Sequence, residues 1–327
     1  MTCCDTLLGV RHIFNIINFV DLLIMQGSIS KKKVNKRKLK ENLTGWLFIT
    51  PLTIGLLLFL LFPLVFAVVV SFTDYSMYSP YGFFEFKFNF IGFENYVKAF
   101  TNQDFMRSIL NACINTIGVP IGIIISLCLT NLLIRNQKGS LFFRTLFYLP
   151  TICGSVIITF IWQWIFTLVP QFLRNEFNIT GLNLLSGNNF LVSMIIMGVW
   201  SGIGTSVLLL YSSMKGVDKS LYEAAAVDGA NSTQQFIHIT IPQVSPVLFY
   251  ILFTGIIGSF QEFARFQVMK GGSPAEYSIM PVWEIYKQVT DAGNLAYASA
   301  LGIVLGLIII AISAIQFVVA KLWVNYD

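Results

Sequence analysis

Charged side chains are scarce in this sequence of 327 residues. Asp, Glu, Lys and Arg make up 11% of it, against about 25% in an average soluble domain. Apolar residues make up 55%, and the mean hydropathy is +0.72. So few polar side chains cannot cover a soluble domain, and the same shortage excludes a disordered chain and a coiled coil. The sequence therefore predicts a polytopic membrane protein.

Residues that carry out catalysis or hold metals are also rare. None of the five cysteines shows the CxxC spacing of a zinc site or a disulfide framework. The only histidines are His12 and His238, and there is no phosphate-binding GxxxxGK[ST] motif. No Ser/His/Asp set can be assembled from the candidates, which fall on both faces of the membrane. We therefore predict that this chain is not an enzyme and that it contains no catalytic residue, no metal ligand and no cofactor of its own.

Six stretches without Asp, Glu, Lys or Arg divide the chain, each 27 to 38 residues long. A helix crosses the hydrocarbon core of a bilayer with about 20 residues, so each stretch is long enough for one crossing. The sequence predicts an all-α protein with six membrane spans, near residues 46–71, 109–133, 145–168, 190–213, 247–270 and 299–321.

Lys and Arg predict the orientation of these spans. If the amino terminus is cytoplasmic, 14 basic residues face the cytosol and six face outward. Seven of them form the run Lys31–Lys40, which precedes the first span. Such a run also occurs in nucleic-acid-binding proteins, but a nearby apolar span favours a cytoplasmic flank in contact with lipid. We expect both termini in the cytoplasm, no nucleic-acid partner, and two regions, 1–41 and 42–323.

The first 25 residues allow two interpretations. Residues 13–25 are too short to cross a bilayer and contain Asp21. Their polar residues recur on one helical face, which is typical of an amphipathic helix on the inner leaflet. Alternatively, the start is overcalled and translation begins at Met25. The sequence does not choose between the two.

One cytoplasmic loop, residues 215–245, carries a distinctive pattern. Ser220 and Glu223 have the spacing of a capping box, which predicts a helix start. Gly229 stands where a helix would end in a left-handed residue. A second cap at Asn231–Gln234 predicts another short helix, to about Ile239, ended by Pro242. The expected product is a helix–turn–helix elbow with an exposed surface of small residues.

The full pattern of this loop, EAA-x-x-DGA-x5-F-x2-I-x2-P-x3-P, resembles the EAA loop of binding-protein-dependent ABC importer permeases. RTLFYLP and IWQWIF within Arg144–Phe166, and GSFQEF at Gly258–Phe263, resemble the carbohydrate-uptake group of these permeases. That group includes the maltose, multiple-sugar and glycerol-3-phosphate systems. The resemblance implies a type I importer permease of the maltose-permease kind. Two departures from the group's pattern are Lys270, where a Thr is usual before the Gly-rich outer turn, and the charges Glu262 and Arg265 after GSFQ.

The resemblance also implies site residues. Those expected to couple to an ATPase are Glu223, Ala224, Ala225, Asp228, Gly229 and Ala230. Those expected to contact sugar are Trp200, Ser201, Gly202, Thr205, Ser259 and Glu262. Aromatic rings stack on sugar faces, and polar groups bind hydroxyls. A helix–helix hydrogen bond is the alternative for each single polar residue, and mutual neutralisation is the alternative for Glu262 and Arg265.

The partners implied are a second homologous permease, two ATP-binding subunits that hold ATP–Mg, and an extracytoplasmic sugar-binding protein. Together they would import a sugar or oligosaccharide across the cell membrane. Two other functions remain open at this stage. An ion-coupled secondary transporter would need an ionisable group at mid-membrane, for which only Glu262 qualifies. A channel or a membrane scaffold is the third possibility.

Overall fold

The computed structural model describes residues 36–79, 85, 88–135, 139–178, 181, 183–187, 189–269 and 279–325. The predicted amphipathic segment 13–25, residues 31–35 of the basic run and Lys270 lie outside these residues. The chain divides into two compact units, which meet between Pro63 and Leu64. Each unit is described by itself, and the boundary predicted after residue 41 stays a prediction.

The described part of the first unit is helical, and its sequence is largely apolar after Asn42. Helix α2, Lys36–Leu56, leads into a π-helical turn, η1, Leu57–Leu61. The hydroxyl groups of Thr50 and Thr53 donate to carbonyl oxygens one turn earlier, at 2.6 and 3.0 Å. These bonds satisfy polar groups within an otherwise apolar stretch, as a lipid environment requires.

The second unit is helical, and the described residues contain no strand beyond one isolated bridge between Thr73 and Phe90. Its helices up to the elbow are α3 (Phe62–Ser71, which starts in the first unit), α4 (Glu94–Thr101), α5 (Gln103–Thr116), α6 (Gly118–Arg135), α7 (Ser140–Ile152), α8 (Ser155–Phe177) and α9 (Asn189–Gly216). The elbow and the rest comprise α10 (Lys219–Val227), α11 (Ser232–Gln235), η3 (Phe236–Thr240), α12 (Ile241–Gln243), α13 (Ser245–Phe260), α14 (Ala264–Met269), α15 (Pro281–Thr290) and α16 (Leu295–Ala320).

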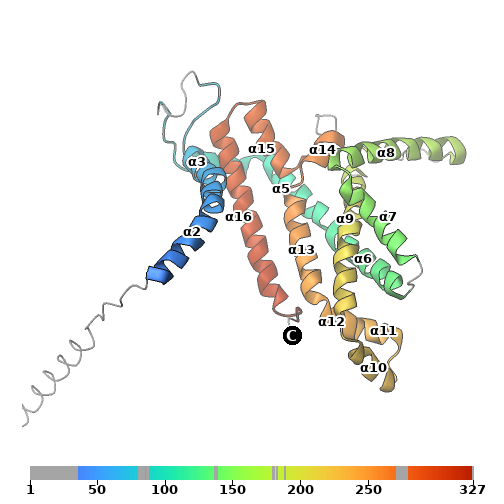
Figure 1. Ribbon diagram of the computed structural model, residues 1–327. Helices are drawn as coiled ribbons and strands as arrows, with labels where there is room; N and C mark the ends of the chain where they lie inside the picture. The colour runs from blue at the N-terminus through green and yellow to red at the C-terminus, as the bar shows by residue number, and fades with distance from the viewer. Residues whose placement is uncertain are drawn as a thin grey trace, which may run out of the picture. The chain divides into compact units, whose positions relative to one another are not determined.

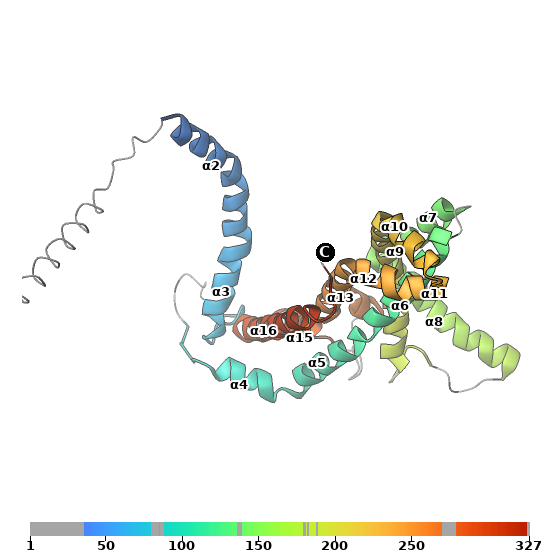
Figure 2. The same ribbon diagram turned by 90° about the horizontal axis from the view of Figure 1, so that it is seen from below.

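Helix α9 is at the centre of the packing, with contacts to α6, α7 and α13. Helix α13 also packs against α16 and α5. In Figure 1, α9, α13 and α16 run side by side, with α10 and α11 at one end and α14 and α15 at the other. Figure 2 views the same helices from below, with α10, α11 and α12 toward the viewer. The elbow and the α14–α15 region therefore lie at opposite ends of these helices.

Five described helices are long and apolar enough to cross a membrane, and a sixth span results if the bent pair Ser232–Gln243 and Ser245–Phe260 counts as one. This agrees with the prediction of six spans. The prediction of one continuous helix over 145–168 is wrong, because the chain is extended at Cys153 and Gly154 between α7 and α8. The predicted span 247–270 is also too long, since α13 ends at Phe260. A hydropathy profile shows how long an apolar stretch is, but it does not show where a helix within that stretch ends.

Candidate functional site

The elbow begins with Asp218 as the N-cap of α10. Its carboxylate accepts the backbone N–H of Ser220 at 3.0 Å, and this bond lowers the pKa of Asp218. The predicted capping box of Ser220 and Glu223 is therefore wrong. Asp218 precedes Ser220 by two positions and is an equally good cap, so the helix starts two residues earlier and Ser220 falls within its first turn.

The turn after α10 confirms the prediction for Gly229, which takes φ +82°. The N–H of Ala230 donates to Ala225 at 2.9 Å, and the N–H of Gly229 donates to Ala226 at 3.1 Å. This pair of bonds is a Schellman motif, which satisfies carbonyl groups at the end of a helix.

The second helix of the elbow starts with the predicted cap. The Asn231 side chain accepts the N–H of Gln234, and the Gln234 side chain accepts the N–H of Asn231, which is a complete capping box. The helix does not end near Ile239 as predicted, but continues through η3 and α12 to Gln243. Pro242 occupies the first turn of α12, where its fixed φ is compatible with a helix. The chain then bends by 65° before α13.

Two side-chain contacts connect the halves of the elbow. The Tyr222 hydroxyl group is 2.9 Å from Thr240 Oγ1. The Gln235 amide donates to the carbonyl oxygens of Tyr222, at 3.4 Å, and Ala230, at 3.3 Å. These bonds hold α10 against η3, so the elbow is one structural element.

The residues predicted for coupling come together on the elbow. Glu223, Ala224, Asp228 and Gly229 are exposed, while Ala225 and Ala230 are half-buried. A shallow groove along the elbow is lined by Ala225, Asp228, Gly229, Ala230, Gln234, Gln235, His238 and Ile239. The surface therefore consists largely of small side chains and is accessible, which suits close docking of another protein. Its role in coupling stays a prediction.

A separate cavity of about 260 Å³ lies among α6, α9 and α13. Three of the residues predicted to contact sugar line it: Gly202, Ser259 and Glu262. A neighbouring cavity of about 250 Å³ is lined by Ser155, Ile158, Gly198, Ser201, Gly202 and Arg265. Ser201 thus lines the second cavity, and Gly202 lines both.

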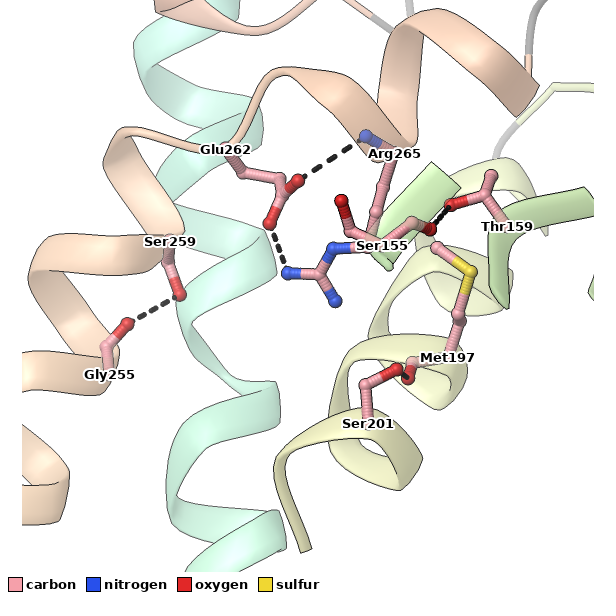
Figure 3. Close-up of polar contacts among 8 residues, drawn as sticks. All are labelled: Ser155, Thr159, Met197, Ser201, Gly255, Ser259, Glu262 and Arg265. Carbon is pink, nitrogen blue, oxygen red and sulfur yellow. Dashed lines mark hydrogen bonds and ion pairs between the residues drawn. The ribbon is translucent and has the colours of Figure 1, made fainter. Parts of the chain in front are cut away.

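The charged residues of the cavity sit where α13 gives way to α14. Glu262 and Arg265 form an ion pair, and their side chains are only 13% and 22% exposed (Figure 3). The backbone N–H of Arg265 also points to the Glu262 carboxylate, at 3.4 Å. Arg265 lines both cavities and was missing from the predicted site. Its signal in the sequence was a charge three residues after Glu262 in a largely apolar region.

Two other residues of the predicted sugar site do not line either cavity. Trp200 is 40% exposed and stacks edge-to-face with Trp162, with ring centroids 5.6 Å apart. Thr205 is exposed on α9, one turn after Ser201. The structure therefore brings four of the six residues to the cavities and leaves these two outside.

The serines of the site bond to their own helices. Ser201 donates to Met197 at 2.8 Å and Ser259 donates to Gly255 at 3.0 Å (Figure 3). Such bonds satisfy a hydroxyl hydrogen within an apolar helix, and they leave the oxygen lone pairs available. Each serine can therefore still accept a hydrogen bond from a ligand.

Comparison with known proteins identifies the family. Residues 118–324 match the family described as binding-protein-dependent transport system inner membrane component. This chain belongs to that family. It is therefore a permease subunit of a membrane transport system, and both the resemblance and the predicted all-helical permease fold are confirmed.

Curated relatives cover nearly the full length of this permease. The probable ABC transporter permease protein YesP of Bacillus subtilis is 30% identical over 88% of this chain and 94% of its own. The probable starch degradation products transport system permease protein AmyD of Thermoanaerobacterium thermosulfurigenes is 30% identical over 85% of this chain and 94% of its own. This chain also resembles a solved structure, that of a bacterial ABC transporter involved in the import of the acidic polysaccharide alginate. The two chains superpose with a TM-score of 0.74 at 19% sequence identity. The match covers 87% of this chain and 97% of the solved chain, which establishes the shared fold.

Proposed function

We propose that this permease imports a sugar or an oligosaccharide together with a second, homologous permease subunit. Several relatives are named for saccharides, among them AmyD and the multiple sugar-binding transport system permease protein MsmF of Streptococcus mutans. The cavity beside α9 and α13 supports the proposal, because it combines an ion pair with serine oxygens inside apolar helices. A sugar hydroxyl group can donate a hydrogen bond to one such group and accept a hydrogen bond from another.

The second part of the proposal is that the elbow binds an ATP-binding subunit. Two ATP-binding subunits hold ATP–Mg, and one of them docks on the exposed elbow face around Glu223 and Gly229. The elbow lies at the far end of α9 and α13 from α14 and α15 (Figure 1). ATP-driven motion at the elbow would thus reach the cavity through helices that pack along their length. In this arrangement both termini are cytoplasmic, and an extracytoplasmic sugar-binding protein delivers the substrate on the opposite side.

The test is reconstitution of the permease pair with its ATPase and binding protein in proteoliposomes. Neutral and acidic oligosaccharides are added in turn, and ATP hydrolysis and sugar uptake are measured. We expect at least one saccharide to stimulate both activities, and the ATPase to co-purify with the permease. Uptake driven by an ion gradient without any ATPase would support the secondary transporter instead, a function that the family membership disfavours.

A further inference from the structure

The Glu262–Arg265 ion pair lies beside two cavities, of which Arg265 lines both and Glu262 lines the first. Both cavities include Gly198, Gly202 and Arg265 in their walls. A Cβ atom on Gly198 would lie 3.3 Å from Arg265 Nη1, so the guanidinium group lies directly over the backbone of α9. Figure 3 shows the Arg265 side chain reaching from the α13–α14 turn across the space toward α8 and α9. A ligand in either cavity therefore lies next to this guanidinium group.

The charge of the cavity lining is balanced. Among the described residues that line either cavity, Glu262 and Arg265 alone carry charge, and each neutralises the other. Both side chains are largely removed from solvent, so water screens them weakly. An anionic ligand finds no free cation in this lining and meets the Glu262 carboxylate as a like charge.

The same pair suits adjacent hydroxyl groups. Glu262 only accepts hydrogen bonds and Arg265 only donates them. Ser201 and Ser259 have committed their hydrogens to their own helices, so they offer lone pairs. Arg265 is therefore the charged donor of this lining, beside the neutral polar side chains of Asn115, Ser155 and Ser206. A vicinal diol, which both donates and accepts, matches this arrangement.

We propose that the Glu262–Arg265 pair selects uncharged saccharides over acidic ones, with Arg265 as a specificity-determining residue. The proposal rests on the proposed function and adds the charge class of the substrate. The structural neighbour described above is involved instead in the import of an acidic polysaccharide, alginate. The selection arises because Glu262 already pairs with the Arg265 guanidinium group, which the carboxylate of an acidic sugar would otherwise bind.

The test uses the purified complex of the two permeases and the ATPase, without the binding protein, and compares matched sugars. Maltotriose and xylotriose are the neutral probes, and trigalacturonate is the acidic probe. Sugar-dependent thermal stabilisation of the purified complex reports binding directly, without selection by the binding protein. We expect a neutral probe to raise the melting temperature of the complex more than the acidic probe does. We also expect the neutral sugar that drives uptake to stabilise the complex.

The variants determine whether the pair carries the selection. Glu262→Gln releases Arg265, so preference should move toward trigalacturonate by about tenfold or more. The double variant Glu262→Gln/Arg265→Gln removes both charges and should lose the acquired preference. Asp104→Asn removes one negative charge from the exposed first turn of α5, outside both cavity linings, and should leave the ratio unchanged.

Two results would overturn the inference while leaving the proposed function intact. One is that the sugar that drives uptake is itself acidic. The other is that Glu262→Gln lowers folded yield and binds neutral and acidic probes in the original ratio, which would assign the pair to structure. Failure of every saccharide to stimulate ATP hydrolysis or uptake would instead reject the proposed function.

Discussion

At the scale of single residues, Gly229 shows how one backbone angle shapes the elbow. Its φ of +82° is strained for any residue with a β-branched side chain, although no neighbouring atom would obstruct a Cβ there. Gly229→Val therefore strains the backbone without a clash inside this chain. We expect substrate-stimulated ATP hydrolysis to fall by about tenfold or more, since such strain costs on the order of 1–3 kcal/mol, while the protein still reaches the membrane.

The matched control at this position is Gly229→Asn. Asn enters the left-handed region far more easily than Val, so this variant should retain most of the activity. Equal ATPase and uptake rates for Val and wild type would remove Gly229 from the coupling site.

Asp74 offers a pH-dependent contact at the residue scale. Its carboxylate accepts the side-chain amide of Asn89 at 2.8 Å and the backbone N–H of Asn89 at 2.7 Å, and these bonds lower the pKa of Asp74. A lowered pKa means that the stabilisation is complete above the unfolded value of about 3.9. It is lost as the pH falls through the lower folded value.

The corresponding measurement compares Asp74→Asn with the wild type. The variant should melt at a lower temperature at pH 6, by a small amount because the pair is exposed. The difference should shrink as the pH falls below about 4, as followed by thermal unfolding of the purified protein in detergent. A difference that persists unchanged at the lowest pH would show that ionisation of Asp74 is not its source.

At the scale of elements, close contact between α7 and α9 depends on Gly204. A Cβ atom there would collide with the Phe147 carbonyl oxygen and would lie 2.8 Å from Thr151 Oγ1. The obstructing atom belongs to the backbone, so it cannot rotate away. Gly204→Ala should destabilise the protein by about 1–3 kcal/mol, seen as a lower melting temperature in detergent.

Gly306 on α16 is the matched control for that variant. No atom lies within 4 Å of a Cβ built at Gly306. Because Ala is the better helix former by about 1 kcal/mol, Gly306→Ala should leave the melting temperature unchanged or raise it. The same direction of change in both variants would contradict the packing argument.

The elbow itself depends on contacts between its two halves. Tyr222→Phe removes the hydroxyl group that bonds Thr240, at a cost of about 1 kcal/mol. Amide hydrogen exchange in α10 should become several-fold faster, while exchange in α9 stays the same. Tyr250→Phe, at an exposed side chain of α13, should change neither. Unaltered exchange in α10 after Tyr222→Phe would show that the hydroxyl contact does not hold the elbow.

At the scale of the whole molecule, the opposite placement of the elbow and α15 predicts membrane topology. A cysteine at Ser232 on α11 should react only with reagents from the cytosolic side. A cysteine at Asp291, just after α15, should react only from outside. The background protein must lack its natural cysteines. Labelling of both positions from one side would contradict the six-span arrangement.

Much of this protein follows from its sequence. Long uncharged stretches are costly to expose to water and must be helical in lipid, so the number of spans follows from composition. The left-handed Gly229 and the cap at Asn231 are local, because their hydrogen bonds join residues only a few positions apart. Such features can be predicted without tertiary packing.

Tertiary structure decided the rest. The break at Cys153–Gly154 divides a stretch without charged residues, so hydropathy does not show it. Helix α13 ends at Phe260, just before the polar residues Gln261 and Glu262, although the hydropathy of 247–270 favoured one continuous span. The two cavities arise from helices that are distant in the chain, and so does the position of Arg265 over Gly198. Periodicity in a sequence describes one helix at a time. The site depends on which faces of several helices meet, and packing alone determines that.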